Sequence, residues 1–426
     1  MGAEPGDLAM LEWLRRHAVP LESLDPTGTL DDLQAVRPMF EGARVVGLGE
    51  DNHGTREFFR VKHRLLRFLV EEMGFTRFAM EAPYATGRAV DDYVRFGCGQ
   101  AGDVWTSLRY TTWDNTEIVD MIQWMRDYNA GVPEQRMIRF WGVDVTYTSG
   151  GAEFLRDFLA RVAPQRLAAV EPVLDKLMES DDRFPNARTE TDSDALAAGA
   201  PVLDDLIAFV RSDRDPLEEE TSRDEVDSVE MLLTVMGQWS RNGDVSRSRH
   251  MGENLVQLLD RSAVDTKVVF WAHNSHIDRD WDEGEPSAGG VLSERYGPAY
   301  TPWRLDCAHG SLSARARDEG TFGSYGVEPV RPKPADSLAG CLDRTGLGNL
   351  AVDLRPGADL DAVAAWTATP AWIPDEPSSP DEGPSASDVA QDLPTARYDG
   401  MVFVQEISPA HPTANGLANA AAGRGL

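Results

Sequence analysis

The sequence predicts an α/β protein with a twisted, mostly parallel central sheet that is flanked by helices and carries a helical insertion. Short runs of branched and aromatic residues, each the length of a buried strand, alternate with amphipathic segments, which is typical of parallel sheets. Four of these runs end in acidic residues, histidines or both: residues 43–54, 78–81, 138–144 and 267–276. Because ligands bind at the carboxyl ends of strands in open α/β sheets, these groups predict one shared site, and therefore an enzyme.

The length of 426 residues allows two or three domains, or one large α/β domain with insertions. An apolar content of 42% is enough for a substantial core. The formal net charge of −30 argues against nucleic acid or an anionic membrane as a partner, since these require clustered Lys and Arg. An acidic surface mainly keeps a protein soluble, and attraction of a cationic substrate is the open alternative.

The cysteines and the N-terminus bear on the cell compartment. Cys98, Cys307 and Cys341 are widely spaced and form no CxxC pair, so we expect reduced thiols and a cytoplasmic location. The first residues lack the basic and apolar regions of a signal peptide. No stretch approaches the roughly 18 consecutive apolar residues of a membrane span, so we expect no membrane partner.

The first 150 residues predict three strands and five helices in alternation. The expected strands are 43–48, 76–81 and 137–143, and the expected helices are 8–19, 29–39, 56–73, 86–96 and 116–129. The helix over 56–73 has one apolar stripe and Gly74 at its C-cap. Its basic residues Arg60, Lys62, Arg64 and Arg67 are expected to fill the remaining surface. The helix at 116 is expected to be capped by Asp114, Asn115 or Thr116.

Residues 151–240 lack strand-like runs and are rich in Ala, Leu, Asp and Glu, so we predict a helical insertion or a cap over the strand ends. The α/β core is then formed by residues 1–150 and 241–426. Further strands are expected at 267–272, 303–307, 349–354 and 400–404. The Pro-, Ser- and Asp-rich stretch 367–396 predicts a long loop or disordered insert, and residues 413–426 a frayed tail.

His53 lies in a glycine-bracketed turn between a predicted strand and a predicted helix, where close backbone approach is allowed. With Glu50 or Glu81 accepting a hydrogen bond from one ring nitrogen, the imidazole could act as a general base near neutral pH. A histidine before a glycine is often structural. The three other polar strand ends favour the functional interpretation here.

His273 and His276 are spaced i, i+3 at a predicted helix start, so both side chains could face one cleft. One of them could bind or protonate a substrate oxygen while the other is structural. His63, in contrast, lies within a basic helix and is predicted to be a surface residue.

Other chemistries fit the sequence less well. Histidine and carboxylate could ligate zinc or iron, but no HExxH motif is present, so we expect no metal. The G-x-S-x-G elbow of serine hydrolases and the glycine-rich nucleotide fingerprints are also missing from the sequence, which predicts no cofactor. The chemistry that remains is the activation of water, or the removal of a proton from the substrate, by a histidine.

The chain resembles the erythromycin esterase family, some of whose members hydrolyse a macrolactone ring. The matching pieces occur in order and span almost the whole chain: residues 49–58, 78–82, 124–129, 141–144, 249–254, 272–276 and 399–403. The resemblance implies a cytoplasmic, metal-independent hydrolase with a helical subdomain. It places the general base on His53, the supporting acids on Glu50 and Glu81, and the second histidine pair on His273 and His276.

Two positions depart from the family pattern. Lys62 stands where the characterised esterases have arginine, which keeps the charge but loses bidentate geometry. Asp51 and Asn52 replace small or hydroxyl residues, and the added carboxylate of Asp51 is expected to raise the pKa of the base and alter the substrate pocket. We expect the substrate-binding residues to be Lys62, Asp51, Asp144 and Arg56.

The leading hypothesis is an esterase acting on a small-molecule ester or lactone, with His273 or His276 and nearby basic groups stabilising the oxyanion. The alternative is a lyase or cyclase of natural-product biosynthesis that uses the same histidine to remove a proton from the substrate. A binding protein with a degenerate site is a third possibility. The sequence leaves the number of subunits open.

Overall fold

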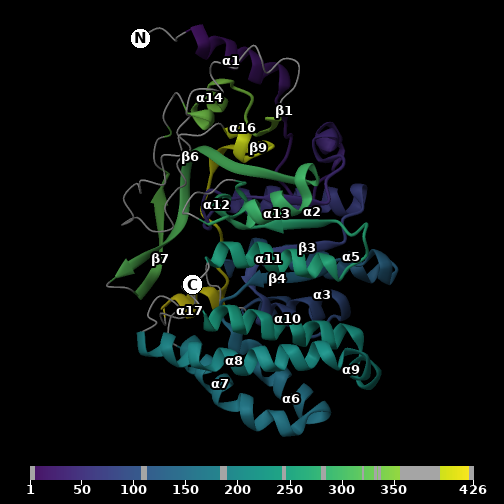
Figure 1. Cartoon of the computed structure of the whole chain (residues 1–426). Coiled ribbons are helices and arrows are strands. Elements are labelled where there is room, and N and C mark those ends of the chain that lie inside the picture. The colour runs from purple at the N-terminus through teal and green to yellow at the C-terminus, as the bar shows by residue number, and fades with distance from the viewer. Residues whose placement is uncertain are drawn as a thin grey trace.

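A nine-stranded sheet crosses the molecule (Figure 1), in the order β1-β8-β9-β6-β2-β5-β3-β4, with β7 paired to β6. The computed structural model describes residues 5–106, 113–182, 190–241, 246–279, 285–318, 321–330, 333, 337–355 and 394–421. The strands are β1 Val19–Pro20, β2 Val45–Leu48, β3 Arg77–Pro83, β4 Arg139–Asp144, β5 Val268–Trp271, β6 Tyr300–Asp318, β7 Thr321–Pro329, β8 Leu350–Asp353 and β9 Gly400–Ile407.

Helices flank the sheet on both faces (Figure 1). The α-helices are α1 Pro5–His17, α2 Arg56–Met73, α3 Tyr84–Phe96, α4 Ala101–Thr106, α5 Thr116–Ala130, α6 Ala152–Val162, α7 Pro164–Asp182, α8 Glu190–Ser212, α9 Arg214–Glu220, α10 Arg223–Ser240, α11 Arg247–Asp260, α12 Asn274–Ile277, α13 Ala288–Tyr296, α14 Leu338–Arg344, α16 Pro394–Arg397 and α17 Ala414–Ala421. Short 3₁₀ helices are η1 Asp31–Phe40, η3 Glu134–Arg136, η4 Thr148–Gly151 and η6 Gly297–Ala299.

The six strands from β9 to β4 run parallel, β8 pairs antiparallel with β9, and β1 pairs antiparallel with β8. The predicted fold class, a mostly parallel sheet with flanking helices, is confirmed. Successive side chains of a strand enter different cores: Val45 packs with α11 and α13, and Val46 packs with α2. The sequences of such strands are continuous apolar runs because helices cover both faces of the sheet.

Helix α2 begins and ends where the sequence predicts, and Gly74 caps it with a left-handed backbone (φ 75°). The prediction that its basic face is exposed is wrong, because Lys62 and Arg64 are buried. Arg64 pairs with Asp32 of η1. His63 is also buried, with its ring 5.4 Å from that of Trp124, and is not a surface residue. Neighbouring elements therefore cover α2 on more than its apolar stripe.

The helical segment, which consists of α6 to α10 in the described residues 152–182 and 190–240, has its own hydrophobic cluster. That cluster also takes in Tyr84 and Ala85 of α3 and Val145 after β4. In Figure 1 these helices stack beside the β4 edge of the sheet. An ion pair between Arg139 of β4 and Asp224 of α10 links the segment to this edge strand.

Three predictions need correction. Residues 31–40 form a 3₁₀ helix that contains Pro38, where an α-helix was expected. The strand predicted at 303–307 is longer, since β6 runs on to Asp318 and pairs with β7. Residues 414–421 of the tail predicted to fray form α17, where the Thr413 hydroxyl accepts a hydrogen bond from Gly416 N and donates one to Asp114, and residues 422–426 lie outside the described residues. Most of the predicted insert, residues 367–393, lies outside the described residues.

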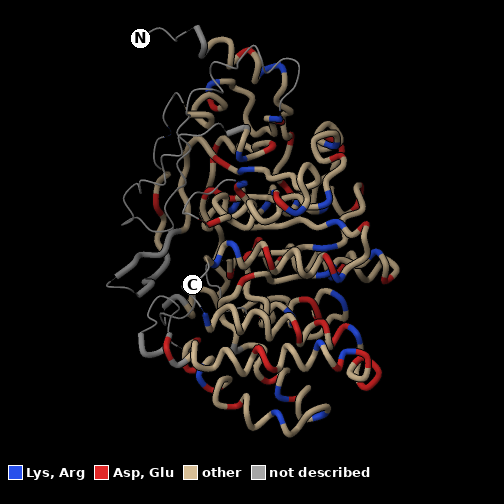
Figure 2. The backbone as a smooth tube through the Cα atoms, in the orientation of Figure 1, with Lys and Arg blue, Asp and Glu red and all other residues tan. Residues whose placement is uncertain are grey.

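Acidic and basic residues are interspersed along most of the elements (Figure 2). None of the described helices combines the length and the apolar character needed to cross a membrane.

Asn129, at the end of α5, fastens that helix to α3 and to the approach to β4. Its amide donates to Val94 O (3.0 Å) and Ile138 O (2.9 Å), and its Oδ1 accepts from Ile138 N (2.7 Å). Asn129→Ala leaves three buried backbone groups unpaired, so we expect it to lower the free energy of unfolding by about 2–4 kcal/mol in urea titrations. The control is Gln34→Ala at an exposed position. An equal, small effect of both changes would contradict this account.

Candidate active site

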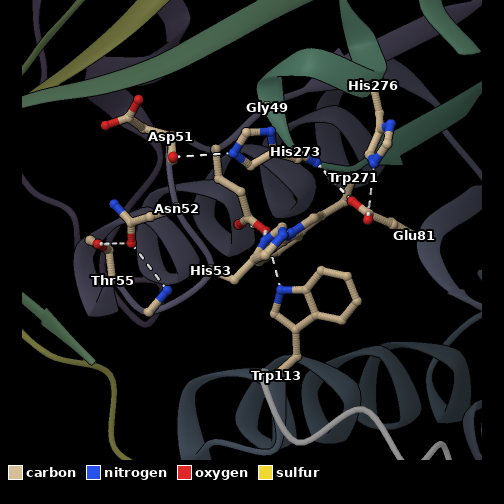
Figure 3. Close-up of polar contacts among 12 residues, drawn as sticks. Gly49, Asp51, Asn52, His53, Thr55, Glu81, Trp113, Trp271, His273 and His276 are labelled. Carbon is tan, nitrogen blue, oxygen red and sulfur yellow. Dashed lines mark hydrogen bonds and ion pairs between the residues drawn. The ribbon is translucent and has the colours of Figure 1, made fainter. Parts of the chain in front are cut away.

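The acidic residues and histidines that follow the predicted strands lie together at the carboxyl ends of the parallel strands (Figure 3). Strands β2, β5, β3 and β4 are neighbours in that order. The loop after β2 carries Glu50 and His53, β5 leads to His273 and His276, and Glu81 lies near the end of β3. Parallel pairing brings together groups that are more than 200 residues apart in the chain.

The loop after β2 is tightly held by its neighbours. A Cβ atom on Gly49 would collide with the Asn274 amide, and one on Gly54 with the Ser313 backbone. The Asn274 side chain in turn bonds both backbone groups of Leu305, in β6. The glycines around His53 are therefore required by close packing, and the packing fixes the direction of the loop.

The Glu50 carboxylate is the centre of the site and has no exposed surface. Four hydrogen-bond donors surround it. Oε1 contacts His53 Nδ1 (2.7 Å) and accepts from the Trp113 indole (3.1 Å). Oε2 accepts from Lys62 Nζ (2.8 Å) and the Trp271 indole (3.1 Å). Two donors on each oxygen satisfy a buried carboxylate in its ionised form.

The charge of Lys62 keeps Glu50 ionised. Burial alone would raise the pKa of Glu50, but the Lys62 ammonium and the His53 hydrogen bond outweigh it and lower this pKa. Burial also lowers the pKa of Lys62, to about 8, although Glu50 opposes the shift. Lys62 further donates to Gly49 O (2.9 Å) and lies 3.8 Å from the centre of the Trp271 ring. The prediction that Lys62 contacts substrate disagrees with its complete burial.

His53 is anchored on one side of its ring only. Nδ1 is bonded to Glu50, and in the described part of the chain Nε2 has no hydrogen-bond partner. The side chain is 19% exposed and lies edge-on to Trp113 and His273, with ring centres 5.0 and 5.2 Å away. Burial would lower the pKa of His53, but the hydrogen bond and charge of Glu50, followed by the charge of Glu81, raise it.

His273 uses both ring nitrogens to hold the loop after β2. Nδ1 accepts from Ser275 N (3.3 Å), so Nε2 carries the proton and donates to the Asp51 carbonyl (3.2 Å). The backbone N–H of His273 donates to Glu81 Oε2 (2.9 Å). This ring is therefore a clamp between two strand ends, with its proton already committed.

His276 and Glu81 form the second charged part of the site. His276 contacts the Ser248 hydroxyl through Nδ1 (2.9 Å) and Glu81 Oε1 through Nε2 (3.2 Å). Arg247 also donates to Glu81 (2.9 Å) and bridges it to Asp144. Burial would raise the pKa of Glu81, but His276 and Arg247 hold it well below its ordinary value.

The Asp51 carboxylate does not lie beside the base, as the sequence analysis expected. It is buried against Arg304 (3.3 Å) and Lys333 (3.0 Å), which also pair with Asp306. Figure 3 shows it directed away from His53. The raised pKa of His53 therefore arises from Glu50 and Glu81, and the departure at Asp51 instead builds a buried ion-pair network.

The remaining predicted residues are Asp144 and Arg56. Asp144 is buried under Arg247, so it positions that arginine within the site. Arg56 pairs with Glu117 (3.5 Å), apart from the network of Glu50 and the histidines. In the described residues, one group has metal-ligand spacing, and it comprises Asp51, Asp306 and Cys307. Arg304 and Lys333 already balance the charge of its carboxylates.

Sequence reasoning missed three participants: Trp113, Trp271 and Arg247. Trp271 lies near the end of a predicted strand, two residues before His273, which was an available signal. Trp113 lies shortly before α5 and Arg247 is the first residue of α11, and no local pattern separates them from the other Trp and Arg residues. Only the packing of distant elements brings them to Glu50 and Glu81.

Known proteins resemble this chain over most of its length. A family model described as Erythromycin esterase matches residues 70–407. Erythromycin esterase type II of Escherichia coli is 24% identical over 292 residues, which are 63% of this chain and 68% of the relative. A putative hydrolase of Bacillus subtilis (strain 168) is 22% identical over 439 aligned positions, covering 93% of this chain and 91% of the relative. The crystal structure of a Bacillus cereus protein superposes with a TM-score of 0.80 at 22% identity, over 96% of this chain and 99% of that one, and shares the fold.

The Lys62–Glu50 pair gives a test of the buried charge network. Removing one member leaves the other charge buried and unpaired, so we expect Lys62→Met to lower the free energy of unfolding by about 3–5 kcal/mol. The double variant Glu50→Gln/Lys62→Met should lose less than the sum of the two single variants, as measured in a double-mutant cycle.

The matched control is the pair Arg37–Glu72, which forms a contact of similar length (2.8 Å) with both side chains partly exposed. Arg37→Met should cost less than about 1 kcal/mol. If Lys62→Met cost no more than this control, Lys62 would not be the group that sustains Glu50.

Proposed function

Because the chain belongs to the erythromycin esterase family, we propose that it is a metal-independent hydrolase of a carboxylic ester or lactone, with His53 as the general base. The family supports ester hydrolysis. The assignment of the base and the independence from metal are proposals that rest on the arrangement of the side chains.

The availability of the His53 ring carries the proposal. Both ring nitrogens of His273 and of His276 are bonded to neighbouring protein groups. His53 has Nδ1 fixed by Glu50, and its Nε2 is left for a water molecule or substrate. With the proton on Nδ1, the Nε2 lone pair is the acceptor that a general base needs.

The proposed reaction moves one proton in and out of this ring. Nε2 takes a proton from water as the water oxygen attacks the ester carbonyl carbon. Glu50 stabilises the resulting imidazolium at 2.7 Å and stays ionised, because Lys62 lowers its pKa. Nε2 then returns the proton to the alkoxide oxygen as the ester C–O bond breaks. The products are a carboxylic acid and an alcohol, with one water consumed.

The negative charge that develops on the carbonyl oxygen requires a donor. Arg247, whose side chain is one-third exposed, contacts Glu81, as does His276. We assign oxyanion stabilisation to these two groups, each of which would exchange a bond to Glu81 for one to substrate. His273 becomes a positioning residue that holds the loop of His53.

The substrate class follows the relatives by analogy. Two curated relatives are named erythromycin esterases, so we propose a macrocyclic lactone or a related natural-product ester as substrate. Cys98, Cys307 and Cys341 are thiols and not disulfides, which fits the reducing cytoplasm.

His53→Ala tests the base directly. Because the proton acceptor is lost, we expect kcat/KM for ester hydrolysis to fall about 100- to 10,000-fold. The assay follows, by mass spectrometry with EDTA present, a panel of macrolides and simple lactones for products that gain one water. The control is His411→Ala, at an exposed position beside Glu117. Activity retained in His53→Ala would refute the assignment, and a product without added water would favour the lyase or cyclase alternative.

The pH dependence of kcat/KM gives a second test. A base must be unprotonated, and the pKa of His53 is raised above its ordinary 6.5. The ascending limb of the profile should therefore lie above pH 6.5. Glu81→Gln removes one of the charges that raise this pKa, so the limb should move to lower pH, whereas the surface change Glu41→Gln should leave it in place. A limb that moves to higher pH in Glu81→Gln would contradict the assignment.

A further inference from the structure

A cavity of about 640 Å³ lies between β4, the outermost strand on one side of the sheet, and the helical segment. Its walls come from β3, β4, α3, α6, α10 and α11, and its lining includes none of the histidines or acids of the candidate active site. Strand β3 lines it with Arg77 and strand β4 with residues 139–142, whereas Glu81 and Asp144 of the candidate active site lie further along these strands. The cavity is thus a separate space of a size that suits small ligands.

The charges on its walls differ from those of the chain as a whole. The protein carries a formal charge of −30, but six arginines and five acids line the cavity. The arginines are Arg77, Arg88, Arg95, Arg139, Arg223 and Arg261. The acids are Asp91, Asp92, Asp224, Glu225 and Asp227.

Ion pairs neutralise four of these acids. Asp91 pairs with Arg139 (2.9 Å) and Arg95 (3.8 Å), and Asp224 contacts the same two arginines at 3.5 and 3.6 Å. Glu225 and Asp227 pair with arginines of the helical segment. Asp92 has no ion pair in the described part of the chain. Of the five acids that line the cavity, Asp92 is therefore the one that these ion pairs do not neutralise.

Two arginines are left without a carboxylate. In the described residues, neither Arg77 nor Arg88 forms an ion pair. The Arg77 guanidinium donates to Thr76 O (2.9 Å), and its buried Nε has no partner. Aromatic rings hold both groups: Arg77 lies 5.5 Å from the Trp141 ring centre and Arg88 lies 3.5 Å from that of Phe154.

The electrostatics agree with an unneutralised charge. Burial, followed by the neighbouring Arg139, lowers the pKa of Arg77 to about 10. A cation held away from water and beside a second cation is stabilised by any anion that reaches it. A guanidinium presents a planar fork of N–H donors that matches a carboxylate or a phosphate.

We propose that this cavity binds a small organic oxyanion, a carboxylate or phosphate ester on an apolar body, with Arg77 and Arg88 as the anion-binding residues. Trp141, Phe154 and Leu258, which also line the cavity, offer contacts for the apolar body. The site lies at the junction of the helical segment and the sheet and is independent of the hydrolytic site.

Isothermal titration calorimetry of the full chain with phenyl phosphate, benzoate, inorganic phosphate and neutral benzyl alcohol tests the proposal. We expect one saturable site for phenyl phosphate or benzoate with a Kd of about 1 mM or tighter, weaker binding of inorganic phosphate, and none of benzyl alcohol. Arg77→Gln and Arg88→Gln should each weaken binding by about tenfold or more, because each removes a charge-assisted contact.

The controls place the binding in the cavity. Arg37→Gln changes the charge equally at a distant surface position and should leave the Kd unchanged, as should His53→Ala. Arg88→Lys keeps the positive charge but loses the planar guanidinium, so we expect it to retain part of the affinity. This variant still tests the proposal if Arg77→Gln does not fold. The proposal would be overturned by absence of saturation by about 10 mM, by Arg77→Gln and Arg88→Gln binding as tightly as the unsubstituted protein, or by loss of binding in His53→Ala.

Discussion

The buried carboxylate of Glu50 is the constraint on which the candidate site depends. A charge with no exposed surface is tolerated only when its hydrogen-bonding capacity is met, and here the four donors come from four different parts of the chain. Meeting that requirement fixes the loop of His53, the burial of the Lys62 side chain, and the orientation of the Trp113 and Trp271 indoles. The same requirement explains why a basic residue lies on a buried face of a helix.

Differences in hydrogen bonding, more than residue type, separate the histidines of the molecule. His53 keeps one ring nitrogen available, while both ring nitrogens of His273 and of His276 contact other protein groups. His63 is buried, and burial lowers its pKa to about 3, so this ring is neutral at any physiological pH. Four imidazoles in one chain thus have three kinds of environment, set by what packs around them.

The sequence predicted the order of the elements and the apolar residues of the sheet, because strand-length apolar runs and amphipathic stripes depend on neighbouring residues. Helix α2 and the cap of α5 at Asn115 lie where local patterns put them. The pairing of β6 with β7 and the folding of α17 were missed. The β6–β7 pairing joins segments that are close in the chain, but they are rich in Gly, Ser and Arg and show no continuous apolar run. Helix α17 is held by a contact with a distant residue, Thr413 with Asp114.

The sequence by itself determined which acids and histidines end the strands, since each follows its own apolar run and parallel strands bring their ends to one edge. Only the tertiary structure decided what each group does there. It directed the Asp51 carboxylate to Arg304 and Lys333, away from His53, and brought Trp113 and Arg247 to the site. These contacts join segments far apart in the chain, so packing and the pairing of buried charges decide them, and no local pattern records them.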